Sequence, residues 1–64
     1  MTKKDIEFIS KAKKFIIIKD DTKYEFLEWK GAATFYNKSI KTAKEIELSA
    51  IYGLVGKTIA YKYN

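Results

Sequence analysis

The side chains able to do chemistry in this chain are lysines, carboxylates, aromatic rings and the hydroxyls of Ser10, Ser39 and Ser49, because histidine and cysteine are both absent. The commonest general base and the thiol nucleophile are therefore missing. The carboxylates form no catalytic pair: on one strand Glu25 and Glu28 would point to opposite faces, and Asp20-Asp21 falls in an expected turn. We expect no enzyme, no catalytic residue, no cofactor and no metal site.

Every basic side chain is a lysine, and the chain carries a formal net charge of +5. Lysines near exposed rings have the parts for nucleic-acid binding, since ammonium groups contact phosphates and rings stack on bases. Without arginine the bidentate recognition of guanine is missing, so we expect backbone- or shape-directed binding with little sequence specificity. The candidates are Lys3, Lys4, Lys11, Lys14, Lys41 and Lys44 for phosphates, and Trp29 and Tyr36 for stacking.

A protein partner is the alternative. Small single domains often dock onto a larger protein, and this chain resembles accessory or inhibitor proteins of phages and mobile elements in size and composition. Such a module would use an exposed aromatic sheet face or an open strand edge, and the same surface would support a homodimer. No apolar run is long enough to span a membrane, and no secretory signal is evident. We therefore expect a cytoplasmic protein with no membrane partner.

The candidate rings lie in a stretch that reads as a sheet, residues 13–37. Two apolar runs, 14–19 and 23–30, are separated by Asp20-Asp21-Thr22, which suits a short hairpin loop. Pairing them about this loop sets Ile16 opposite Phe26. A third strand at 32–38 would then complete an antiparallel meander.

The period-two alternation of strands sorts the apolar side chains of this meander onto two faces. Ile16, Ile18, Tyr24, Phe26 and Phe35 would share one face, which the first helix is expected to cover. The other face would carry Phe15, Ile17, Leu27, Trp29, Thr34 and Tyr36, as a stacking platform or as a second buried layer.

Two capping boxes, Thr2 with Asp5 and Thr42 with Glu45, predict helix starts on either side of the sheet stretch. The first helix, about residues 3–13, has an apolar stripe and a lysine-rich opposite side. The second would begin near Ala43 and end at a glycine. Residues 44–52 also alternate as a half-buried strand would, which leaves that alternative open. A last strand is expected at 58–63.

The chain is expected to form a single small globular domain, residues 1–64, of the α+β class. Its elements would be an N-terminal amphipathic helix, a three-stranded antiparallel meander, a second helix and a short C-terminal strand. If residues 44–52 are a strand, the alternative is a small five-stranded β-barrel with an N-terminal helix.

Two short segments resemble parts of known nucleic-acid-binding families. Residues 39–44, Ser-Ile-Lys-Thr-Ala-Lys, look like the start of the second helix in double-stranded-RNA-binding domains. Residues 47–59 are similar to a helix-turn-helix, with Gly53 at the turn and Thr58-Ile59 opening the recognition helix. The two resemblances place Gly53 differently, so at most one of them can apply.

Overall fold

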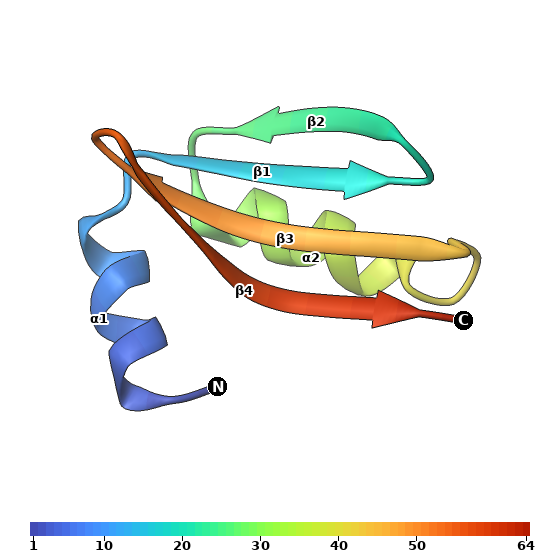
Figure 1. The fold of residues 1–64 in the computed structure, drawn as a ribbon, viewed down its shortest axis with the longest axis horizontal. Helices are drawn as coiled ribbons and strands as arrows, with labels where there is room; N and C mark the ends of the chain where they lie inside the picture. The colour runs from blue at the N-terminus through green and yellow to red at the C-terminus, as the bar shows by residue number, and fades with distance from the viewer.

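A computed structural model describes all 64 residues as two helices and four strands (Figure 1). In chain order the elements are α1 (Lys3–Lys11), β1 (Lys14–Lys19), β2 (Thr22–Phe26), α2 (Trp29–Ser39), β3 (Glu45–Tyr52) and β4 (Val55–Tyr63). The α+β class is confirmed, as are the first helix, the first hairpin and the C-terminal strand.

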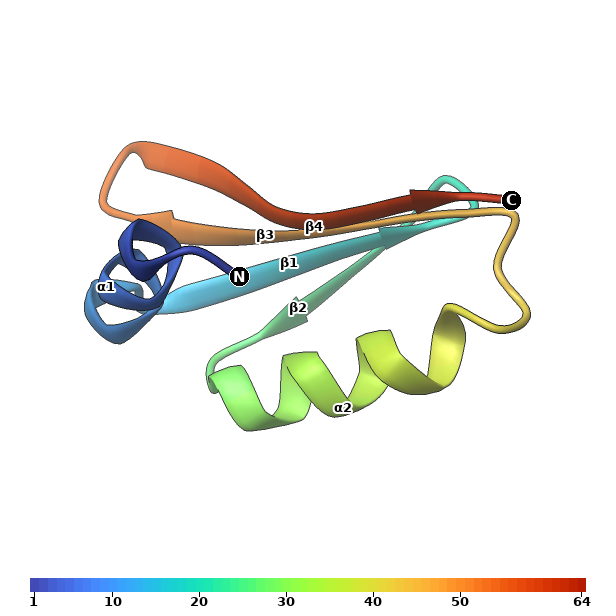
Figure 2. The ribbon, with the colours of Figure 1, turned by 90° about the horizontal axis from the view of Figure 1, so that it is seen from below.

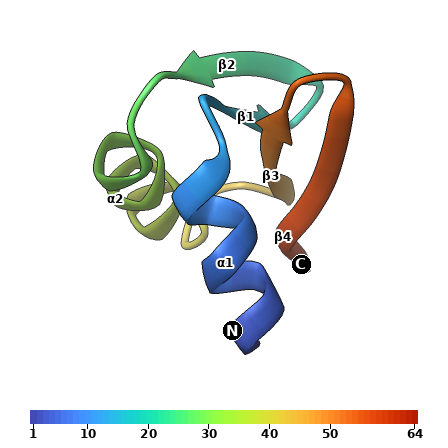
Figure 3. The ribbon, with the colours of Figure 1, turned by 90° about the vertical axis from the view of Figure 1, so that its left-hand side faces the viewer.

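The four strands form one open antiparallel sheet in the order β2-β1-β3-β4. Two hairpins therefore lie side by side, with β1 and β3 in the centre and β2 and β4 at the edges. Because β2 and β3 run parallel, the chain between them must cross a face of the sheet, and α2 makes this crossing. Both helices lie on the same side of the curved sheet (Figures 2 and 3). The sheet does not close, so the five-stranded barrel is wrong.

The first hairpin has a tighter turn than the sequence predicts. Asp20 and Asp21 both have positive φ angles, 47° and 70°, which is the signature of a two-residue type I′ turn. Thr22 thus belongs to β2, and Phe26 pairs with Phe15 instead of Ile16. This one-residue shift moves Tyr24 and Phe26 to the opposite face of the sheet.

Residues 32–38, predicted as the third strand, lie inside α2. Trp29, Ala32, Ala33, Tyr36 and Ile40 recur at helical spacing, and their side chains are buried or half-buried against the sheet. The predicted strand 23–30 accordingly ends at Phe26. The three-stranded meander is wrong because this apolar stripe needs a helix to face the core.

Residues 45–52, predicted as the second helix, form β3. Ile46, Leu48 and Ala50 alternate toward the core, and β3 gains hydrogen-bonding partners on both sides from β1 and β4. Thr42 does not cap the start of a helix, because its hydroxyl donates to the Ser39 carbonyl at the end of α2. Since 45–52 and 55–63 are both strands, neither partial resemblance to a nucleic-acid-binding motif holds.

The core lies between the helices and the two central strands. Its three largest fully buried side chains are Ile17, Ile46 and Leu48. α1 closes one end of this core, with the capping box at Thr2 and Asp5 formed as predicted. The far face of the sheet stays open to solvent, and Ile18 on it is 40% exposed.

Candidate functional site

The carboxylates have structural roles. No three metal-ligating side chains come together anywhere in the chain. The Asp20 carboxylate accepts the backbone N–H groups of Lys44 and Glu45, both at 3.0 Å, and so ties the tip of the first hairpin to the start of β3. On the open sheet face Glu45 and Glu47 accept hydroxyl hydrogen bonds from Tyr61 and Thr58 on β4.

The predicted phosphate-binding lysines do not gather on one surface. Lys3, Lys4 and Lys11 lie on α1 at one end of the molecule, and the loop carrying Lys41 and Lys44 lies at the other end (Figures 1 and 2). Lys14 is on the open sheet face, 3.5 Å from the Glu25 carboxylate. The separation follows from the strands, which span the molecule between these two groups.

Trp29 and Tyr36, the predicted stacking residues, come from α2 rather than from strands. Trp29 packs edge-to-face on the buried Phe15 ring, with centroids 5.6 Å apart. Tyr36 is half-buried, and this burial raises the pKa of its hydroxyl. Both rings line an apolar groove of about 310 Å³ that Met1 and the β4 residues Ile59 and Ala60 also border. They form part of a packed layer, and the flat platform expected from the sequence is absent.

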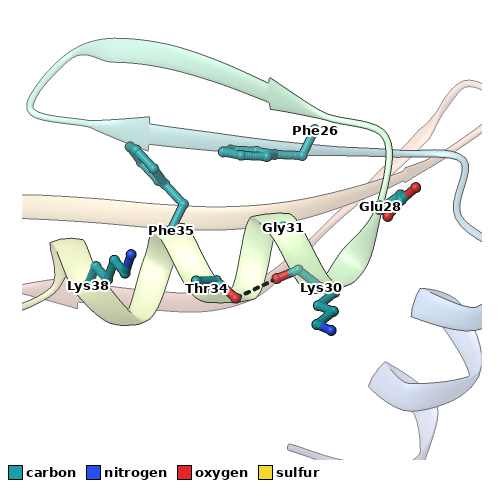
Figure 4. Close-up of a pocket in the computed structure, with 7 residues that line it drawn as sticks. All are labelled: Phe26, Glu28, Lys30, Gly31, Thr34, Phe35 and Lys38. Carbon is teal, nitrogen blue, oxygen red and sulfur yellow. Dashed lines mark hydrogen bonds between the residues drawn. The ribbon is translucent and has the colours of Figure 1, made fainter.

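A second groove, of about 530 Å³, runs between α2 and the edge strand β2 (Figure 4). Its apolar part is formed by Phe26 and Phe35, whose ring centroids lie 5.4 Å apart, and Tyr24 packs on Phe35 with centroids 4.7 Å apart. The α2 side of the groove is lined by Glu28, Lys30, Gly31, Thr34, Phe35 and Lys38. The groove therefore combines an aromatic floor with a polar, largely cationic wall.

The strand beside this groove has an unpaired edge. The residues flanking a two-residue hairpin turn bond each other, so Thr22, Tyr24 and Phe26 direct their backbone groups to β1. The N–H and C=O groups of Lys23 and Glu25 then point outward from the sheet, where no strand follows. Free backbone hydrogen-bonding groups thus lie directly beside a concave surface.

Some charged side chains along β2 and its groove form ion pairs and others do not. Glu25 lies between Lys14 and Lys23, at 3.5 and 3.4 Å, and these ammonium groups, chiefly Lys23, lower the pKa of its carboxyl. The third ion pair of the protein joins Lys57 to Asp5. Lys30 and Lys38 take part in no ion pair, although both are exposed on the groove wall.

A four-residue spacing in the sequence indicates this row of polar side chains, but only if residues 32–38 are a helix and not a strand. Lys30, Thr34 and Lys38 are four residues apart, which places them in one row along a helix. In the predicted meander Lys30 ends one strand and Thr34 and Lys38 lie on the next, so the three residues do not form such a row.

No family model, no curated protein and no solved structure matches this chain. Neither helix has the length and apolar character that crossing a membrane would require.

Proposed function

We propose that this protein is a small non-enzymatic binding module that takes up an extended segment of a partner protein as an additional strand beside β2. The observation that carries the proposal is that the edge strand β2, whose backbone groups at Lys23 and Glu25 face outward, borders the groove between α2 and β2 through Phe26. Strand addition gains affinity from main-chain hydrogen bonds and specificity from pockets for alternate side chains. The β2 edge and its groove supply both.

The other sheet edge supports this choice by contrast. β4 carries an irregularity in its pairing with β3, since Thr58 and Ala60 pair with consecutive β3 residues and Ile59 is passed over. Such bulges twist an edge away from further pairing. β2 pairs with β1 without interruption.

The test uses the full chain and peptides selected on it from a random peptide library. NMR titration should show the selected peptides shifting the amide signals of Lys23 and Glu25 and slowing the hydrogen exchange of both amides. Amides on the β4 edge, such as Tyr63, should not change. Peptides that bind at α1 or along β4, or a library that yields no binder, would contradict the proposal.

A pair of proline variants checks the edge itself. Lys23→Pro removes an outward N–H that β1 does not use, so the fold should survive while peptide binding falls by about tenfold or more. Tyr63→Pro removes a corresponding outward N–H from β4 and should leave peptide binding unchanged. Circular dichroism shows whether each variant is folded.

The second candidate function is nucleic-acid binding, through the lysines of α1. Lys3, Lys4 and Lys11 are exposed on its outer side, and none of them is in an ion pair. If α1 binds phosphates, a fluorescent DNA duplex should bind at low salt, with log K falling by roughly 0.9 for each phosphate contact per unit of log salt. Lys4→Glu with Lys11→Glu should then abolish this binding. Weak binding with no such salt dependence excludes it.

A further inference from the structure

The charges along β2 match those of a second copy of the same strand. Lys23 and Glu25, the two β2 residues whose N–H and C=O groups face outward, carry opposite charges. Their side chains lie on the open face of the sheet, with the Lys23 ammonium nitrogen 3.4 Å from a Glu25 carboxylate oxygen. Thr22, Tyr24 and Phe26 alternate with them and face the helix side of the sheet. The edge therefore presents one cation and one anion, each on a residue with free backbone groups.

The positions of these backbone groups restrict how two β2 strands can pair. In an antiparallel pair, residues with outward-facing groups must lie opposite each other. If Lys23 lies opposite Lys23, or Glu25 opposite Glu25, like charges meet, which is destabilising. If Lys23 lies opposite Glu25 of the second copy, two residue pairs each exchange two hydrogen bonds, and no outward group of β2 is left without a partner. Backbone and charge thus favour the same alignment, with a two-fold axis at Tyr24.

This alignment brings complementary side chains together on both faces. On the open face, Lys23 and Glu25 of the two copies form a square in which each carboxylate has an ammonium group on either side. On the helix side, Tyr24 lies opposite Tyr24 of the second copy in a non-hydrogen-bonded pair, where cross-strand side chains are closest. Tyr24 packs on Phe35 and is still 36% exposed. Opposite-charge pairs and aromatic pairs across strands both stabilise a sheet.

The outer side of β2 has room for a second copy. In Figure 1 no element lies beyond β2, and α2 runs behind the strands on the inner side of this edge. A two-fold axis normal to the sheet would join two four-stranded sheets into one continuous sheet, with the helices of both copies on the same face.

We propose that the free protein forms a dimer through β2, antiparallel and with Tyr24 at the two-fold axis, and so covers the edge that a partner segment would use. β2 contributes five residues from each copy. A standard interface has about 20–30 residues a side, so this dimer is weak and forms only as the protein concentration rises. The pairing does not depend on the proposed function. Its consequence, that a partner segment competes with the second copy, rests on that function.

Single cysteines test the alignment, because the chain has no cysteine of its own. In a glutathione buffer, Tyr24→Cys should give at least tenfold more disulfide-linked dimer than Lys23→Cys or Glu25→Cys. Only at residue 24 does a residue lie opposite its own copy, with about 4.5 Å between Cα atoms, which a disulfide can bridge. At residues 23 and 25 the two copies are about 7–8 Å apart, which is too far.

Mass spectrometry without reducing agent measures the disulfide-linked dimer, and circular dichroism shows whether each cysteine variant is folded. Equal yields at the three positions would mean random collision, and a highest yield at 23 or 25 would mean another alignment. Either result overturns the proposed dimer.

Charge variants without cysteine give an independent test by NMR diffusion over a range of protein concentrations. Lys23→Glu and Glu25→Lys each turn both cross-strand pairs into like-charge pairs, so each variant alone should dimerise about tenfold more weakly. An equimolar mixture of the two restores opposite charges and should dimerise as well as the natural protein. Measurement at 0.15 M salt limits general repulsion between the chains to about 8 Å.

The matched control is Lys62→Glu, which changes the net charge as Lys23→Glu does but lies on the other edge strand, β4. It should leave dimerisation unchanged. An equal loss in Lys62→Glu and Lys23→Glu, or a natural protein whose diffusion does not depend on its concentration, would show that β2 does not pair with itself.

The failure of this inference is distinct from the failure of the proposed function. Without any peptide, the Lys23 and Glu25 amides should exchange more slowly as the protein concentration rises, and selected peptides should bind more weakly at high protein concentration. A chain that stays monomeric while peptides protect these two amides overturns the dimer and leaves strand addition intact. A dimer crosslinked through Tyr24→Cys, with no library peptide binding at β2, overturns strand addition and supports the dimer.

Discussion

Asp20 and Asp21 occupy the two central positions of the first hairpin turn and have different roles. Both residues adopt a left-handed conformation, which costs about 1 kcal/mol for a residue other than glycine. Asp20 also accepts two backbone hydrogen bonds from the start of β3, whereas no hydrogen bond to the Asp21 side chain is present. Glycine substitutions should separate these roles.

Asp21→Gly should stabilise the protein by about 0.5 kcal/mol, because relief of the left-handed strain exceeds the added entropy of the unfolded chain. Asp20→Gly gains the same relief but loses the two hydrogen bonds to Lys44 and Glu45. It should therefore be about 1–2 kcal/mol less stable than Asp21→Gly. Urea unfolding of both variants measures this difference, and equal stabilities would show that the contact to β3 contributes nothing.

Asp5 joins the N-terminal helix to the last strand through Lys57, at 2.9 Å. The hydrogen bond from Lys57 lowers the pKa of the Asp5 carboxyl. A lowered pKa means that the folded state binds this proton more weakly than the unfolded state, so the contribution is fully present above about pH 4 and is lost as the pH falls further. Asp5→Asn should be less stable than the natural protein at pH 6, and the gap should close near pH 2. A gap that stays constant in urea midpoints across this range would contradict the prediction.

At the scale of elements, α2 is where sequence pattern and local propensity conflict. Its first turn has no acidic side chain, its N-cap residue Glu28 makes no capping hydrogen bond, and Gly31 lies inside it. Glycine in a helix costs about 1 kcal/mol relative to alanine. The helix forms because its apolar side packs on the sheet. This stabilisation cannot be inferred from the sequence of residues 29–39 alone.

Gly31→Ala should stabilise the protein by about 1 kcal/mol. An added Cβ would lie 3.5 Å from the Phe26 ring, an ordinary contact that requires no movement. Because Gly31 lines the groove, the same methyl group should weaken peptide binding at the β2 edge. Thermal unfolding and peptide titration of one variant check both effects. An increase in stability without loss of binding would remove Gly31 from the binding surface.

At the scale of the whole molecule, 64 residues support only a small core. A chain of this length has a total free energy of unfolding of roughly 3–10 kcal/mol. Helices cover one face of the sheet, so the consecutive residues Ile17 and Ile18 have opposite environments: Ile17 is fully buried and Ile18 is 40% exposed. Substituting each of these two residues therefore measures how much of the free energy of unfolding depends on the covered face.

Ile17→Ala should cost about 3–4 kcal/mol, enough to unfold a large fraction of the chain at room temperature. Ile18→Ala should cost only about 1 kcal/mol, because the side chain is partly exposed and its removal leaves no enclosed cavity. Circular dichroism and urea unfolding distinguish the two. Equal losses would mean that the open sheet face is covered in solution, for example by a second copy of the chain.

The candidate site follows from the same tertiary arrangement. The rings and lysines that line the groove are all evident in the sequence, but Phe26 and Phe35 meet only because α2 crosses back over β1 and β2. Lys30 and Lys38 become the two ends of one row only when residues 29–39 are a helix. The sequence analysis singled out other lysines and rings and missed the surface that Phe26, Phe35, Lys30 and Lys38 line.

By itself the sequence determined the features that depend on near neighbours: the capped first helix, the hairpin about Asp20-Asp21, the last strand and the α+β class. The β1–β2 register follows from the two-residue turn at Asp20 and Asp21, whereas tertiary structure alone decided the states of 32–38 and 45–52. In each case two local patterns are close in free energy, and burial against a distant element selects one. For 45–52 the capping box at Thr42 favours a helix, but pairing on both sides with β1 and β4 outweighs a single cap.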